Sequence, residues 1–303
     1  MRPQLMHQAT LGGHRAGVYA LARGLEEGTF YTSGSDGQVA EWRTADPTQA
    51  RGLAKMDGAC WALATLPDPG LLVLGLNRQG LHFIDLHSRQ ALGSLALPPA
   101  DFFALEPTGP AQVAVGGSDG SVHLVDPIAG RLVASAQVSA KAIRTLRLWE
   151  GHTLLAAGSD GQVRLLRLPG LEVLAAWPAH TPTVMALCPL PGRRLVTGGR
   201  DARIRLWQLD DATPTLLQEV PAHHYAVYDL AADPTGTLLL SASMDKTLKL
   251  WDAATLRLLR VHDKARHQGH SSSVNRCLWL SATQAVSCSD DRTAILWTLQ
   301  EVS

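Results

Sequence analysis

Seven copies of one short pattern run along this chain, and each copy is a Gly/Ser/Asp-type turn followed at once by an apolar or aromatic strand. The first copy reads SGSDGQVAEW (Ser33–Trp42) and the last reads SCSDDRTAILW (Ser287–Trp297). Successive turns lie 41 to 46 residues apart, at Asp36, Arg78, Asp119, Asp160, Asp201, Asp245 and Asp291. Each unit of such a repeat buries its hydrophobic face only against its neighbours. We therefore expect seven similar units that stabilise one another.

The units are predicted to be β-sheets. Runs such as VYALAR (Val18–Arg23) and QVAEW (Gln38–Trp42) are short, bounded by turns and rich in β-branched or aromatic residues. No stretch shows helical periodicity over ten or more residues. Four strands per unit and seven units packed radially give an all-β, seven-bladed β-propeller with four-stranded antiparallel blades. The repeats fill the chain, which is 46% hydrophobic, so residues 1–303 are predicted to form a single domain.

The two ends of the chain indicate how the ring closes. The last unit stops at its third strand, shortly after Trp297, and the segment Gln4–Leu11 precedes the first unit. We expect this N-terminal segment to form the outermost strand of the last blade, where it also protects an open sheet edge.

A second regularity links four of the units. The first, fifth, sixth and seventh each contain a His, a Ser or Thr, an Asp and a Trp at matching positions. The four sets are His14, Thr32, Asp36 and Trp42; His180, Thr197, Asp201 and Trp207; His223, Ser241, Asp245 and Trp251; and His270, Ser287, Asp291 and Trp297. A buried carboxylate needs donors, which the imidazole, the hydroxyl and the turn amides can supply. Each set is therefore predicted to be a structural hydrogen-bonded tetrad.

In this repeat length and these four sets the chain resembles the WD40 family, whose blades often hold a His–Ser/Thr–Asp–Trp tetrad. Asp, His and Ser also look like a catalytic triad. However, the set recurs four times in register, and an active site need not be copied around a ring. We therefore predict that the protein has no catalytic residues and is not an enzyme.

The second, third and fourth units depart from the tetrad together. Apolar or small residues replace its members, which suits a network that works only when complete. The replacements are Met56, Pro98 and Ser139 for His, Leu74, Val115 and Ala156 for Ser/Thr, and Ile84, Val125 and Leu166 for Trp. Asp119 and Asp160 remain, and we expect them to serve the tight turn alone.

The resemblance implies that partners dock on the top face, around the central channel. Three positions per blade point there: three and five residues after the histidine position, and one before the turn aspartate. Aromatic residues, Met and Arg gather at these positions, as they do in interface cores. The predicted partner-binding residues are Tyr19, Trp61, Asp101, Phe103, Arg144, Met185, Arg200, Tyr228, Met244, Asn275 and Asp290. A second interpretation stays open, in which these side chains fill the channel mouth or pack between blades.

The chemistry of these residues suggests a ligand. Arg144 and Arg200 are expected on neighbouring blades, where they either grip a carboxylate or phosphate or pair with Asp101 or Asp290. We hypothesise that the protein is a scaffold or adaptor for a protein or peptide segment that carries an apolar anchor and an acidic group.

Two other classes of function are considered. The chain has 27 basic and 27 acidic residues, so a nucleic-acid partner is not favoured. An RNA- or ribosome-associated role nevertheless remains the alternative, because arginines cluster at positions 193, 194, 200, 203 and 205. A metal-dependent hydrolase is less favoured still, because only Asp101 and Asp290 bring acidic groups to the channel positions.

The segment Val261–His270 is longer than the other connections between units. Its His262, Asp263, His267 and His270 look like metal ligands. However, His270 already belongs to a tetrad, and the other three are expected on a polar surface loop. We therefore predict no metal and no cofactor.

The last expectation concerns location and assembly. The four cysteines show no CxxC spacing and are expected to be small buried thiols in a reducing cytosol. The N-terminus lacks the apolar core of a signal peptide, and the apolar stretches are too short for a membrane helix. A cytoplasmic, monomeric propeller is expected.

Overall fold

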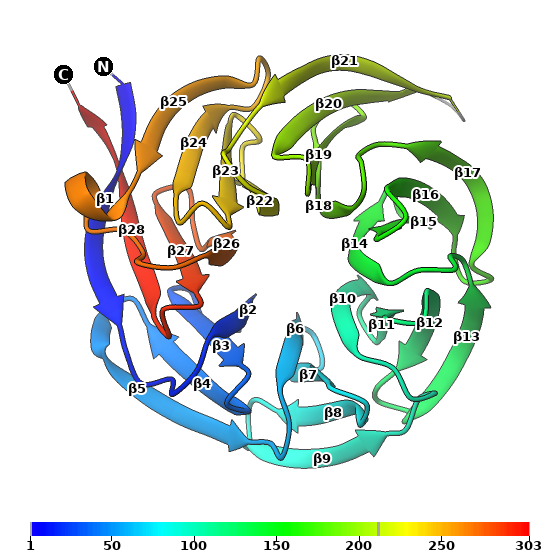
Figure 1. Cartoon of the computed structure of the whole chain (residues 1–303). Coiled ribbons are helices and arrows are strands. Elements are labelled where there is room, and N and C mark those ends of the chain that lie inside the picture. Colours follow the sequence, from blue (N-terminus) through cyan, green and yellow to red (C-terminus); the bar gives the residue numbers. More distant parts are fainter. Residues whose placement is uncertain (1, 211–212, 303) are drawn as a thin grey trace.

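The computed structural model describes residues 2–210 and 213–302, and these residues form a ring of seven four-stranded antiparallel sheets (Figure 1). The predicted seven-bladed β-propeller with four-stranded blades is therefore confirmed. In each blade the first strand lies nearest the centre of the ring and the last lies on its rim (Figure 1). The starts of seven different strands consequently meet around one central channel.

The strands follow chain order in the first six blades. The first three blades consist of β2 (Val18–Arg23), β3 (Thr29–Gly34), β4 (Gln38–Arg43) and β5 (Asp46–Lys55); β6 (Cys60–Leu66), β7 (Leu71–Leu76), β8 (Gly80–Asp85) and β9 (Gln90–Leu95); and β10 (Phe102–Gly109), β11 (Gln112–Gly117), β12 (Ser121–Asp126) and β13 (Arg131–Gln137). The next three consist of β14 (Ile143–Trp149), β15 (Thr153–Gly158), β16 (Gln162–Arg167) and β17 (Glu172–Pro178); β18 (Val184–Leu190), β19 (Arg194–Gly199), β20 (Arg203–Asp210) and β21 (Thr213–Pro221); and β22 (Val227–Ala232), β23 (Leu238–Ser243), β24 (Leu248–Asp252) and β25 (Arg257–His262).

The seventh blade combines the two ends of the chain. It consists of β26 (Val274–Trp279), β27 (Gln284–Ser289), β28 (Ala294–Val302) and β1 (Arg2–Leu11), and β1 pairs antiparallel with β28. The predicted closing strand is confirmed and starts two residues earlier than expected. Leu5 packs into a core cluster shared with blade 6, whereas Leu11 packs into a cluster shared with blade 1. The closing strand therefore holds both neighbours of the last blade.

The four tetrads form in the structure. In blade 1, His14 Nδ1 lies 3.1 Å from Asp36 Oδ2, His14 Nε2 lies 2.8 Å from Thr32 Oγ1, and Trp42 Nε1 donates to the same hydroxyl at 2.9 Å. The same three contacts recur in blades 5, 6 and 7 at 2.7 to 3.1 Å. Burial raises the pKa of Asp201, but hydrogen bonds and charge from His180 and Arg205 outweigh it and lower that pKa to about 2.

The remaining turn aspartates do more than hold their turns, contrary to expectation. Asp119 accepts a hydrogen bond from Ser121 Oγ at 2.7 Å, and that hydroxyl also contacts the buried His123. Asp160 accepts from Ser139 Oγ at 3.0 Å and pairs with Arg164 at 2.5 Å. The blades that lack a tetrad thus use nearby polar side chains to satisfy the same carboxylate. Periodic alignment placed Ser139 at the histidine position but overlooked Ser121 and Arg164, which occupy positions that the tetrad does not use.

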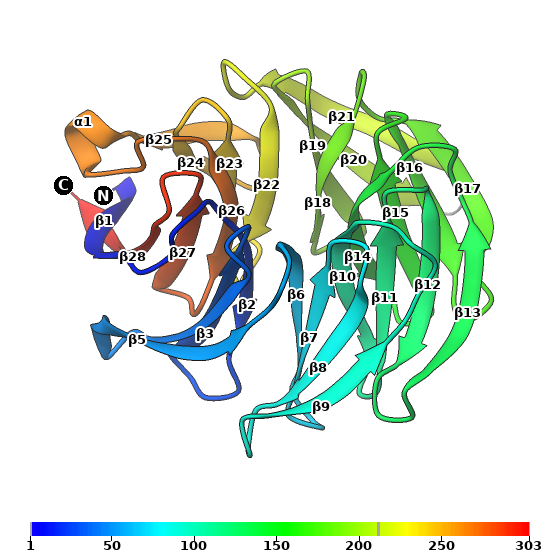
Figure 2. The same cartoon turned by 60° about the horizontal axis from the view of Figure 1, so that its bottom comes forward.

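His262 also differs from expectation, because it is 1% exposed rather than on a polar surface loop. It ends β25, and its Nε2 accepts the backbone N–H of Leu5 at 3.1 Å. Its ring packs edge-on against Trp297, with centroids 5.6 Å apart. A helix of four residues, α1 (Lys264–His267), follows beside β1 and β28 (Figure 2). His262 therefore ties the outer strand of blade 6 to the closing strand.

Within the described residues, no helix is long and apolar enough to span a membrane.

The closing strand provides a paired test of stability. Leu5 is 1% exposed and Met6, the next residue, is 40% exposed. We expect Leu5→Ala to lower the free energy of unfolding by about 2–5 kcal/mol, since it leaves a cavity, and Met6→Ala to change it by less than about 0.5 kcal/mol. Urea unfolding measures both, and deletion of residues 1–11 should lower the melting temperature further. Equal effects at Leu5 and Met6, or an unchanged melting curve after the deletion, would refute the closing role of β1.

The buried His262 predicts a pH dependence. Burial, helped by the neighbouring His267, lowers the pKa of His262 from 6.5 to about 4. Between these values the unfolded chain binds the additional proton, so the stability from this residue is complete above pH 6.5 and falls as the pH drops toward 4. The loss is about 3 kcal/mol at most. Urea unfolding at several pH values between 4 and 7 measures how the free energy of unfolding depends on pH. This dependence should be weaker in His262→Gln, which keeps an acceptor. An unchanged dependence would contradict the assignment.

Candidate functional site

A β-bulge interrupts the innermost strand of every blade near its start. In β2 the pairing with β3 skips from Val18 to Ala20, and the same single-residue skip occurs in the other six inner strands. A bulge leaves its extra residue unpaired and re-aims that side chain. The skipped residues are Tyr19, Trp61, Phe103, Arg144, Met185, Tyr228 and Asn275, which we call the channel ring.

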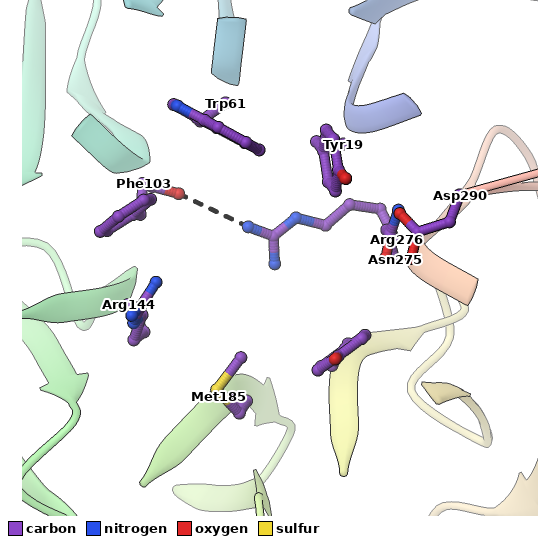
Figure 3. A pocket seen from close by; sticks show the side chains of 9 residues that line it. Tyr19, Trp61, Phe103, Arg144, Met185, Asn275, Arg276 and Asp290 are labelled. Carbon is purple, nitrogen blue, oxygen red and sulfur yellow. Dashed lines mark hydrogen bonds between the residues drawn. The ribbon is translucent and has the colours of Figure 1, made fainter. Parts of the chain in front are cut away.

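The channel ring lines one pocket at the mouth of the channel, with a volume of about 380 Å³ (Figure 3). Asp290 and Arg276 complete the lining. Eight of the eleven residues predicted to bind a partner are thus brought together. The other three, Asp101, Arg200 and Met244, are not part of the lining, and Arg200 and Met244 are exposed. The pocket volume is at the small end of the range for ligand sites.

One side of the pocket is a continuous row of neighbouring side chains. The rings of Tyr19 and Trp61 lie 4.7 Å apart, and those of Trp61 and Phe103 lie 6.5 Å apart. Arg144 continues the row, with Cζ 4.2 Å from the centre of the Phe103 ring. Its Nε donates to Ser159 Oγ at 3.2 Å, which fixes the guanidinium over the ring. The wall therefore combines apolar area with positive charge.

The other side of the pocket is held by amide and carboxylate groups. Asn275 Nδ2 donates to Val18 O at 2.9 Å and to Asp290 Oδ1 at 2.8 Å, which links blade 7 to blade 1. Burial, followed by the nearby Asp290 charge, raises the pKa of Tyr19 to about 12, so the phenol keeps its proton. Among the described residues, Arg144 and Arg200 form no ion pair with Asp101 or Asp290. The Arg144 guanidinium thus remains available to a ligand.

Arg276 is the lining residue that the sequence argument missed. It follows the bulge residue Asn275, and Figure 3 shows its side chain extending across the centre of the ring toward Phe103. The sequence holds a usable signal for it. The residue after the bulge is small in five blades, whereas blades 6 and 7 have the opposite charges Asp229 and Arg276 there: Ala20, Ala62, Ala104, Thr145, Ala186, Asp229 and Arg276.

Below the pocket, charged side chains narrow the channel to a cavity of about 100 Å³. Asp229 Oδ1 lies 3.8 Å from Arg276 Nη1 and 3.8 Å from Arg147 Nη2, and Arg147 Nη1 lies 3.6 Å from Glu106 Oε2. Asp229 also accepts the backbone N–H of Cys277 at 3.0 Å. Burial raises the pKa of Glu106, although Arg147 opposes that shift. We call these four residues, Glu106, Arg147, Asp229 and Arg276, the channel waist.

The shared carboxylate of the waist predicts a stability effect. Asp229→Ala leaves the buried Cys277 N–H without its acceptor and two partly exposed guanidinium groups without that carboxylate, so it should cost about 1–3 kcal/mol of unfolding free energy. Glu27→Ala, at an exposed position, should change it by less than about 0.5 kcal/mol. Urea unfolding compares the two variants. A cost for Asp229→Ala as small as that of Glu27→Ala would mean that the waist contributes nothing to the fold.

Comparison with protein families matches four of the seven units. The model described as "WD domain, G-beta repeat" matches residues 6–43, 171–208, 214–252 and 263–298. These are the units with complete tetrads, so the units that lack the tetrad are also those that the family model does not match.

Several curated proteins are similar to part of the chain. SIR4-interacting protein SIF2 of Saccharomyces cerevisiae is 32% identical over 95 residues, which cover 31% of this chain and 16% of that protein. Human WD repeat-containing protein 37 is 30% identical over 93 residues, or 31% of this chain and 18% of that protein. Ribosome biogenesis protein ytm1 of Neurospora crassa is 36% identical over 63 residues, or 21% of this chain and 13% of that protein. The matches thus span less than a fifth of each relative.

Proposed function

Because this chain belongs to the WD40-repeat family, we propose that it is a non-catalytic scaffold or adaptor that binds a segment of a partner protein in the pocket at the channel mouth. One observation carries the proposal: seven bulges turn seven side chains into a single pocket. Four of these are aromatic, one is Arg and one is Met, which are the residue types enriched in the cores of protein interfaces.

The tetrads support a non-catalytic role. The hydroxyl groups of Thr32, Thr197, Ser241 and Ser287 belong to residues that are 0% exposed. Each hydroxyl already contacts a histidine and accepts an indole N–H. A hydroxyl enclosed in this way has no access to a substrate. The burial of these hydroxyls therefore supports a structural role for the tetrads over a catalytic one.

The pocket lining favours a partner segment with an apolar anchor and an acidic group. The aromatic wall supplies apolar area, and the two guanidinium groups of Arg144 and Arg276 line the same pocket. Aromatic rings also attract cations, but two guanidinium groups in the pocket oppose a cationic ligand. Arg276 takes the role that the sequence argument gave to Arg200.

The alternative of RNA binding has less support. In the arginine cluster that suggested it, Arg193 pairs with Glu150 at 3.1 Å, and Arg203 pairs with Glu219 at 2.7 Å. Arg205 pairs with Asp201 at 2.8 Å. Because carboxylates already neutralise these arginines, the cluster attracts a phosphate backbone less strongly.

All four cysteines are free and buried, which suits a reducing compartment such as the cytoplasm.

The test is affinity capture from native lysate with quantitative mass spectrometry. We expect the Trp61→Ala, Arg144→Ala double variant to capture at least tenfold less partner than the unaltered protein. The two substitutions remove an apolar anchor site and a charge from the pocket. The matched control is Arg200→Ala, Met244→Ala, which alters two exposed residues outside the pocket lining, and it should retain the partner. Melting curves check that both variants are folded. Equal capture by both would place the binding surface elsewhere.

A further inference from the structure

We propose that the pocket binds the C-terminus of a partner protein end-on, with Arg276 binding the terminal carboxylate and the aromatic wall holding the last side chain. The inference rests on the proposed function and specifies the part of the partner that enters. Its basis is the place of the Arg276 guanidinium, the charge around it and the narrow space beneath the pocket.

The Arg276 guanidinium has hydrogen-bonding capacity left for a ligand. It has five N–H donors. Its hydrogen bond to Phe103 O is 3.5 Å long, and its Nη1 lies 3.8 Å from Asp229 Oδ1. Charge-assisted hydrogen bonds are normally 2.7–2.9 Å long, so neither contact is a strong one. Because its side chain is 27% exposed in the pocket, a carboxylate can approach it and accept two parallel hydrogen bonds.

The charges around the pocket favour an anion. Burial lowers the pKa of Arg144, and the nearby charges of Arg200 and Arg276 add to that effect although Asp101 opposes it. Asp290, the one carboxylate that the described residues contribute to the pocket lining, already accepts a hydrogen bond from Asn275. An entering carboxylate would therefore relieve repulsion between guanidinium groups.

The shape of the pocket favours the end of a chain over a segment that passes through. Arg276 lies across the middle of the ring rather than on its edge (Figure 3), and beneath it the space narrows from about 380 Å³ to about 100 Å³. In the last residue of a protein, the carboxylate and the side chain leave the same Cα. A central guanidinium and the surrounding rings can therefore bind both at once. An internal Asp or Glu would need both flanking segments to leave through the same narrow mouth.

The surrounding side chains indicate which last residue fits. The rings of Tyr19, Trp61 and Phe103 lie on one side of the pocket, and Met185 and Tyr228 also line it. These groups offer apolar area to a large hydrophobic side chain. We therefore expect Phe or Leu at the end of the partner.

The experiment uses two pools of hexapeptides, each randomised at five positions and ending in Phe or Leu. One pool has free C-terminal carboxylates and the other has C-terminal amides. Immobilised full-length protein captures peptides from each pool, and mass spectrometry counts them. We expect the protein to capture at least ten times more peptide from the free-acid pool than from the amide pool. This capture ratio should fall to about one in Arg276→Gln. Arg131→Gln, the matched control on the outer strand β13, where the side chain is 64% exposed, should keep the ratio of the unaltered protein.

The outcomes separate this inference from the proposed function. The amide pool could instead be captured as well as the free-acid pool, through peptides that carry an internal Asp or Glu and only when Arg276 is present. That result would overturn end-on binding but would still support a peptide-binding pocket. Capture from neither pool would overturn both. If Arg276→Gln does not fold, Arg276→Lys keeps the charge without the bidentate geometry and should still lower the ratio. An unchanged ratio in a folded Arg276 variant would also overturn the proposal.

Discussion

The pairing of β1 with β28 is the interaction on which the rest of the structure depends. Every blade buries its two faces against its neighbours, so a ring with one unsupported blade exposes core surface on both sides of the gap. Here the closing strand places Leu5 in the core next to blade 6 and Leu11 in the core next to blade 1. The buried His262 adds a polar link through its hydrogen bond to Leu5. Closure therefore fixes the positions of all seven inner strands around the channel.

A fixed ring gives the bulges their effect. Seven bulges at equivalent positions turn seven side chains of different chemistry toward one point. The framework that holds them is largely the same from blade to blade, whereas the side chains differ. The tetrads and the closing strand thus belong to the fold, and the channel ring together with Arg276 belongs to the proposed binding site. In this way a repetitive architecture acquires a single, asymmetric pocket.

Periodic features were predictable from the sequence, and features that occur once were not. The blade number, the closing strand and the channel ring follow from a regular spacing, so a position in one unit identifies its counterparts in the others. Arg276 stands where five other blades have a small residue, and His262 lies in the irregular segment between the last two units. His262 is buried because a strand from the other end of the chain covers it, and Arg276 reaches across the channel to Phe103 O in blade 3. Contacts between units distant in sequence decide both.

The most direct measurement of the central claim uses a photo-crosslinking amino acid at one position at a time. Placed at Met185 it lies in the pocket, and placed at Leu217 it lies on β21 at the rim, where the native side chain is 52% exposed. Both proteins are irradiated in native lysate, and their crosslinked products are compared. Our account predicts a discrete crosslinked partner from Met185 and none from Leu217. A partner crosslinked from Leu217 alone would contradict a binding site at the channel mouth.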